Sequence, residues 1–165
     1  MALAMAGPFR VSRRLVEWGL LALVILAVVL VFLRQARWVQ GQAELAALES
    51  TLGVLRLALV FEQLHVETKS AQVNVAPVPR NPFLLLQRPP ANYQGEMIAA
   101  KAVDLQPGSW VYDPECGCVG YLPIDSQWLA SQSGAASIWY RMSGAARVAQ
   151  LVAIEAYSWQ GKALK

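Results

Sequence analysis

The chain has 165 residues, 56% of them hydrophobic, which gives room for one membrane segment and one compact domain. Its net charge of +3 comes from arginines around an apolar segment, Arg10, Arg13, Arg14 and Arg34, so the folded part lacks the clustered charge of a nucleic-acid groove. Two cysteines and one histidine are too few for a disulfide framework or a four-ligand zinc site.

Residues 15–33 read as a transmembrane helix that follows a cytoplasmic segment, 1–14. The run 18–33 has no charged or polar side chain, and about 19 residues at ~1.5 Å each match a bilayer core. Three arginines precede the run and two follow it, which favours a cytoplasmic N-terminus and an external C-terminal domain. Arg34 follows directly and no Ala-x-Ala-like site lies beyond it, so a cleaved signal peptide is the weaker alternative.

Glu17 stands at the edge of this apolar run, where an unpaired carboxylate costs free energy. One interpretation is an ion pair with Arg13 one turn earlier on the same helix. The other is a carboxylate held for a neighbouring copy of the protein. The residues do not decide between the two.

An amphipathic continuation of the helix is predicted over residues 34–66, because no proline interrupts residues 9–76. Leucines recur at steps of three and four in what we call the leucine stripe: Leu45, Leu48, Leu52, Leu55 and Leu59. The stripe is short for a coiled-coil seam. Further apolar residues widen the face beyond such a seam: Val54, Leu57, Val60, Phe61 and Leu64. We therefore expect one helix from near Arg13 to near His65, with a sheet covering this broad face.

Residues 67–165 are predicted to form a loop and a small antiparallel sheet. After the loop, which covers 66–80, Asn81 caps a short helix with Pro82 first and Phe83–Leu86 as its buried face. We expect a weak strand or an irregular lead-in at 97–105, a hairpin of 109–112 with 118–122, and a second hairpin of 137–142 with 147–159 across Ser143-Gly144. The fold class is α+β, a long helix packed on this sheet.

Little in the chain predicts chemistry. His65 is isolated and no nucleophile, base and orienting group occur together, so we expect no enzyme, cofactor or small-molecule substrate. Asp113, Glu115 and Asp125 are expected to be solvated turn residues and not calcium ligands, so no metal site is predicted. Cys116 and Cys118 are a possible disulfide, with an interchain bond or free thiols as alternatives. Four tryptophans are expected in the core and not around a pocket: Trp110, Trp128, Trp139 and Trp159.

Several segments together resemble type IV pilins and type II secretion pseudopilins. These proteins have the same order of parts: a membrane helix, its amphipathic continuation, a loop and a small sheet. Leu15-Val16-Glu17 before an apolar run resembles the start of the prepilin helix. Residues 81–85, 89–93 and 107–113 look like segments of minor pilin-like proteins. The family pattern has a glycine five residues before the glutamate, whereas this chain has Ser12 there, followed by Arg13.

The resemblance implies a bacterial inner-membrane protein with a periplasmic domain, working as a structural or assembly subunit. In the family, the amine freed by cleavage pairs with the glutamate of an adjoining subunit, and Glu17 would be that glutamate. An uncleaved chain would need another cation, which Arg13 or Arg14 of a neighbouring subunit would supply. The implied partners are the membrane and other pilin-like subunits or inner-membrane assembly proteins. An anchored periplasmic adaptor that never enters a filament is the alternative.

Overall fold

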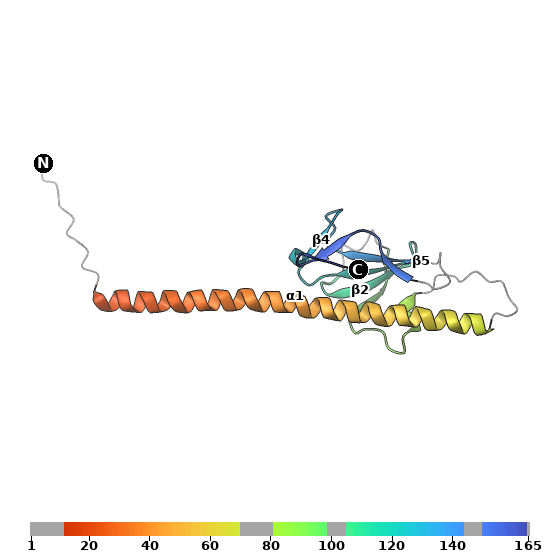
Figure 1. Ribbon diagram of the computed structural model, residues 1–165, viewed down its shortest axis with the longest axis horizontal. Coiled ribbons are helices and arrows are strands. Elements are labelled where there is room, and N and C mark those ends of the chain that lie inside the picture. The colour runs from red at the N-terminus through yellow and green to blue at the C-terminus, as the bar shows by residue number, and fades with distance from the viewer. Residues whose placement is uncertain (1–11, 70–80, 99–104, 144–149, 165) are drawn as a thin grey trace. The chain divides into compact units, whose positions relative to one another are not determined.

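A computed structural model describes residues 12–69, 81–98, 105–143 and 150–164 (Figure 1). The chain divides into two compact units, Met1–Gln40 and Gly41–Lys165. Unit 2 therefore contains the second part of the long helix together with the strands. The sequence prediction had placed boundaries after residues 14, 33 and 66.

The long helix, α1, spans Arg13–Lys69. Ser12 precedes it, and its hydroxyl accepts a hydrogen bond from the Leu15 amide at 3.4 Å, which supplies one of the acceptors that a helix start lacks. The prediction of one uninterrupted helix is confirmed. Its expected end near His65 is wrong by four residues, because Val66–Lys69 continue the helix and the loop cannot begin at Val66. The remaining loop residues, 70–80, lie outside the described part.

A short 3-10 helix, η1, covers Pro82–Leu85, so the short helix is present at the expected place. Asn81 caps it, with its side-chain oxygen accepting from the Phe83 amide at 3.0 Å. The expected buried face is only partly right. Phe83 is fully buried, but Leu84 is 73% exposed, since a helix of four residues can turn only part of its sequence inward.

Five strands form the larger sheet, in the order β1-β2-β3-β5-β6. Their bounds are β1 Tyr93–Glu96, β2 Ser109–Asp113, β3 Cys118–Leu122, β5 Ile138–Ser143 and β6 Gln150–Ala153. The hairpin of β2 with β3 is confirmed, and its register runs from Ser109 opposite Leu122 to Asp113 opposite Cys118. The expectation of a four-stranded antiparallel sheet is wrong, because β1 joins as a fifth strand and lies parallel to β2.

Two further parts of the strand prediction fall partly outside the described residues. A weak strand or an irregular lead-in was expected at 97–105; β1 ends at Glu96, and Met97, Ile98 and Leu105 are not in a strand, in agreement with the irregular alternative. Residues 99–104 lie outside the described part. Of the expected Ser143-Gly144 turn, Ser143 is the last residue of β5, and residues 144–149 lie outside the described part.

The expected long strand 147–159 is two strands in two sheets. After β6 the chain bends over residues 154–156, and β7, Tyr157–Trp159, enters a smaller sheet of order β4-β7-β8. Its neighbours are β4, Leu129–Ser131, and β8, Lys162–Ala163; the short 3-10 helix η3, Ser126–Trp128, precedes β4. Gln160 and Gly161 both have positive φ, 47° and 82°, as a tight two-residue hairpin turn requires.

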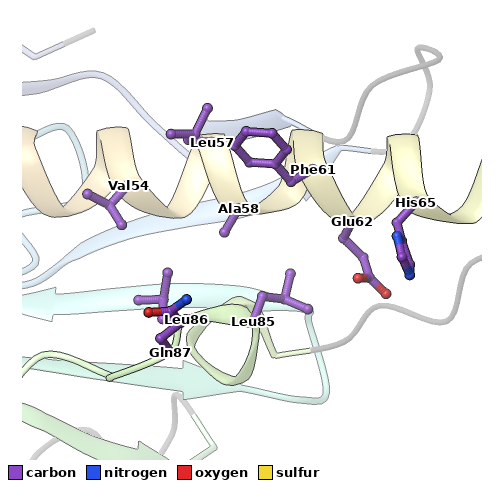
Figure 2. Close-up of a pocket in the computed structure, with 9 residues that line it drawn as sticks. All are labelled: Val54, Leu57, Ala58, Phe61, Glu62, His65, Leu85, Leu86 and Gln87. Atoms are coloured by element: carbon purple, nitrogen blue, oxygen red, sulfur yellow. The ribbon is translucent and has the colours of Figure 1, made fainter.

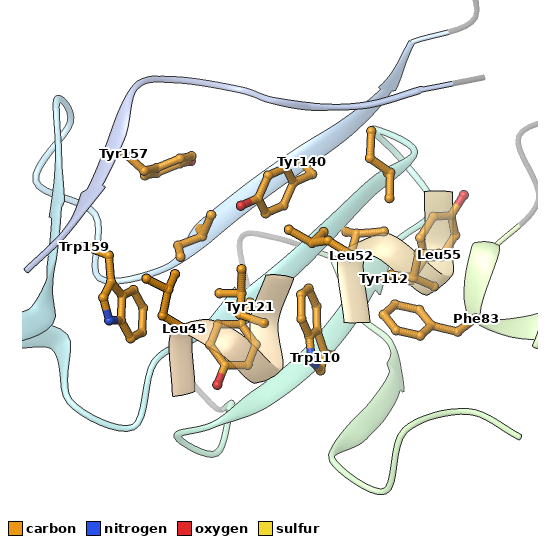
Figure 3. Close-up of a cluster of buried hydrophobic side chains, with 14 of the residues drawn as sticks. Leu45, Leu52, Leu55, Phe83, Trp110, Tyr112, Tyr121, Tyr140, Tyr157 and Trp159 are labelled. Carbon is orange, nitrogen blue, oxygen red and sulfur yellow. The ribbon is translucent and has the colours of Figure 1, made fainter. Parts of the chain in front are cut away.

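The core of unit 2 lies between α1 and the strands (Figure 3). All five leucines of the stripe are buried, with Leu55 at 0% and Leu59 at 7% exposure as the extremes. Large aromatic side chains from the strands and η1 complete the cluster: Phe83, Trp110, Tyr112, Tyr121, Tyr140, Tyr157 and Trp159. Trp110 and Trp159 are core residues as expected, whereas Trp128 and Trp139 are only partly buried.

Candidate membrane anchor and interaction surfaces

The first part of α1 carries apolar side chains on every side. Over residues 13–35 all side chains are exposed, including Trp18 and Phe32 at 70% each. The helix is long and apolar enough to cross a membrane, and none of its most apolar window is buried inside the protein. Apolar surface that no protein covers is favourable in hydrocarbon and costly in water. This part of the helix therefore has the properties of a single-pass membrane anchor.

Two tryptophans bracket the apolar run. Trp18 and Trp38 are 20 residues apart in the helix, about 30 Å at ~1.5 Å per residue, the thickness of a bilayer core. Tryptophan favours the two membrane–water interfaces, where its ring contacts both apolar and polar groups. Arg34 and Arg37 precede Trp38, and their long side chains can reach headgroups from the end of the span.

The polar pair at the start of the anchor is formed within one chain. Arg13 Nε donates to Glu17 Oε1 at 2.9 Å, with side-chain exposures of 94% and 59%. The structure thus contains the ion pair that was one of the two interpretations of Glu17. Arg14 is exposed and makes no ion pair among the described residues. An ion pair this exposed adds little to the free energy of folding in water, and the attraction between its charges is stronger where water is excluded.

The expected broad apolar face of α1 is two separate faces. The strands cover the leucine stripe but not Val54, Leu57, Phe61 and Leu64, which are 49%, 55%, 62% and 53% exposed. At 3.6 residues per turn, the centre of this second set lies about 180° around the helix from the centre of the stripe. The prediction that a sheet covers both sets is therefore wrong, because one sheet contacts only one side of a helix.

A groove of about 430 Å³ runs between α1 and η1 at one side of this second set (Figure 2). Val54, Ala58 and Phe61 line it from the helix, and Leu85 and Leu86 line it from the other wall. Figure 2 shows Val54 and Ala58 facing the two leucines. Its polar lining is confined to one end and one wall, where Glu62, His65 and Gln87 lie. A long, open and mostly apolar groove suits an apolar helix face better than a small polar ligand.

Polar contacts fix the start of unit 2 to the strands. Gly41 O accepts from Trp159 Nε1 at 2.9 Å. Glu44, 7% exposed, accepts from the Tyr121 hydroxyl at 2.7 Å and from the Ile124 amide at 2.9 Å, both through Oε1. Burial and this hydrogen bond raise the pKa of Tyr121. The other oxygen, Oε2, is buried with no hydrogen-bond partner among the described residues. Sequence reasoning missed Glu44, although its place one turn before Leu48 puts it near the stripe.

The remaining predicted polar residues lie in or beside turns. Asp113 was expected to be a solvated turn residue, which is wrong: it is the last residue of β2 and is 3% exposed, because its carboxylate turns towards the backbone of the turn that follows. Cys116 and Cys118 are joined by a disulfide in the turn between β2 and β3, so the interchain and free-thiol alternatives are not what this structure contains. Asp113 accepts from the Glu115 amide at 2.8 Å, and Asp125 caps η3 through the Gln127 amide at 2.9 Å. No group of three possible metal ligands occurs among the described residues.

Comparison with known proteins gives no relative from which a role can be transferred: no family model, no curated protein and no solved structure matches the chain. The anchor and the two faces of α1 are therefore the features from which function has to be inferred.

Proposed function

We propose that the protein is a structural or assembly subunit of a type IV pilus or type II secretion pseudopilus, and that it acts by helix–helix packing and not by catalysis. It is held in a bacterial inner membrane with residues 1–14 in the cytoplasm and its C-terminal domain in the periplasm. Its partners are other pilin-like subunits or inner-membrane assembly proteins.

One observation supports this proposal above the others. A single helix, α1, combines an apolar stretch exposed on all sides with a second part whose leucine stripe closes the core of an α+β domain. The stretch can be stored in the bilayer and, after extraction, can pack against the helices of other subunits, because both surroundings are apolar. The domain would remain outside and make lateral contacts.

Glu17 has a defined role in this proposal. In a packed bundle of such helices, water is excluded, and a carboxylate needs a cation close by. Arg13 or Arg14 of an adjoining subunit would replace the intrachain partner that Glu17 has in the single chain. Exchange of one arginine for another keeps Glu17 paired, and the attraction within the pair is stronger where the surroundings are less polar.

A second function is favoured by the same pair. Glu17 already has a partner in its own chain, and Ser12 stands where a prepilin has the glycine that precedes cleavage. An uncleaved, self-neutralised anchor suits a membrane-anchored periplasmic adaptor of an envelope complex that never enters a filament. Incorporation into a filament separates the two functions.

The test is to follow the chain in its native cell with an antibody to the C-terminal domain. The membrane fraction and the sheared filament fraction are compared for the wild type, Glu17→Ala and the charge-conserving control Glu17→Asp. A filament subunit appears in the sheared fraction as wild type and Glu17→Asp and is lost from it as Glu17→Ala. Confinement of all three to the membrane would reject the filament subunit and leave the adaptor.

A further inference from the structure

An exposed row of residues runs along the second part of α1 with a strict spacing. We call it the outer row; its members follow one another at alternating steps of four and three: Ala43, Ala47, Ser50, Val54, Leu57, Phe61 and Leu64. All seven are exposed. A mean spacing of 3.5 residues is the repeat with which two helices keep one side in mutual contact over several turns.

The outer row and the leucine stripe leave the helix apolar on two opposite sides. A surface helix of a globular domain normally turns charged or polar residues to the solvent. Here the four large members of the row, Val54 to Leu64, are all about half exposed or more. Their neighbours Gly53, Ala58 and Val60 add no charge. An apolar side of this kind indicates a surface that another helix covers.

The membrane anchor limits which helix can cover the outer row. Every copy of the chain inserts into the same membrane in the same direction, and its outer row begins at the same number of residues after the anchor, so a second copy is a partner with a matching row. A parallel pair about a two-fold axis brings each residue of the row opposite its own counterpart, as a self-complementary interface requires. Small residues occupy the first three positions, Ala43, Ala47 and Ser50, where they allow the two backbones to approach closely.

The size of the row fits association in a membrane. The four large residues are 49–62% exposed, and an apolar patch of this kind measures on the order of 400 Å² in each copy. Two copies would bury roughly 800 Å², less than the ~1,200 Å² typical of complexes that are stable in free solution. Confinement to one membrane raises the effective concentration and makes a weaker contact sufficient.

We infer that the outer row is the interface of a parallel pair of two copies of this chain, formed outside the membrane, with the groove beside η1 receiving the flank of the partner helix. The inference rests on the membrane anchor of the proposed function and names one partner, a second copy. It applies to the filament subunit and to the adaptor alike.

Cross-linking through one introduced cysteine, in the full-length chain in its membrane with the Cys116–Cys118 disulfide kept, tests this pair. Ser50→Cys places a thiol in the outer row, and Glu49→Cys places one on the neighbouring exposed position, about 100° away around the helix. After mild oxidation, non-reducing electrophoresis should show a product of two 18.0 kDa chains for Ser50→Cys, several-fold above Glu49→Cys and the unmodified chain. Cross-linking between identical positions requires the parallel arrangement.

A second pair of variants tests whether apolar contact holds the copies together. Leu57→Glu, added to Ser50→Cys, should lower the cross-linked fraction to the level of Glu49→Cys. Ile124→Glu should leave it unchanged, because Ile124 is an apolar side chain, 63% exposed, that belongs neither to the row nor to the groove. Equal cross-linking at positions 50 and 49, no effect of Leu57→Glu, or a product whose mass is not that of two copies would overturn the pair. Incorporation of the Glu17 variants is measured separately, so failure here does not decide the proposed function.

Discussion

Two leucines on opposite sides of α1 allow a matched test of which side faces the core. Leu55 is 0% exposed and Leu57 is 55% exposed, and both stand in the same part of one helix. Replacing a fully buried leucine by alanine removes buried apolar area and leaves a cavity, which costs about 3 kcal/mol within a range of ~2–5. Replacing an exposed leucine changes stability by no more than about 0.5 kcal/mol. Alanine suits a helix equally at both positions, so helix propensity cancels.

The assay is urea unfolding of the full-length chain in detergent micelles, followed by tryptophan fluorescence. Trp110 and Trp159 are both buried beside α1 in unit 2, at 1% and 0% exposure, so their emission reports on this core. The expected result is a clear fall in the unfolding midpoint for Leu55→Ala and almost none for Leu57→Ala. An equal fall in the unfolding midpoint for both variants, or a larger fall for Leu57→Ala, would refute the assignment of Leu55 to the buried side of α1 and of Leu57 to the exposed side. It would also remove the basis for the outer row.

Three further results are expected. Asn81→Ala should lower the free energy of unfolding by about 1–2 kcal/mol, because it removes the cap of η1 and the 2.7 Å hydrogen bond to the Tyr93 hydroxyl; urea titration measures the change. Burial raises the pKa of the Tyr140 hydroxyl from 10.0 to about 12. The unfolded chain therefore loses this proton at a lower pH than the folded chain, and the free energy of unfolding should fall as the pH rises from 10 to 12. Near-ultraviolet circular dichroism measures this fall, which should be smaller for Tyr140→Phe. The double change Val24→Arg and Val28→Arg should cost about 6 kcal/mol of membrane insertion and allow alkaline carbonate to extract the chain, whereas leucine at both positions should not.

Local patterns in the sequence were sufficient for several elements. The leucine stripe was recognisable because spacing on a helix depends only on the chain itself. The Asn81 cap and the hairpin of β2 with β3 follow from neighbouring residues, since each forms within a dozen positions. The anchor was also apparent, because an uninterrupted apolar run needs no tertiary partner to be identified.

The elements that were missed depend on distant partners. Strand β1 is only four residues long and pairs in parallel with β2, so no turn in the sequence indicates the pairing. The bend over residues 154–156 separates β6 from β7, although both read as one apolar alternation. The polar contacts divide in the same way. The ion pair of Arg13 with Glu17, one turn apart, was one of two interpretations open from the sequence, whereas the contact of Glu44 with Tyr121 depends on the tertiary fold.

The two apolar sides of α1 have the strongest bearing on function, and spacing alone could not distinguish them. Both follow steps of three and four, so each satisfies the condition for a buried helix face. Only long-range packing shows that the sheet covers the leucine stripe and leaves Leu57 and Phe61 in contact with solvent. Between Val54 and Leu64 the charged side chains are Arg56 and Glu62, too few to give the helix a polar side. Because exposed apolar surface is unfavourable in water, the same packing that completes the core of one chain leaves the surface on which the proposed pair would form.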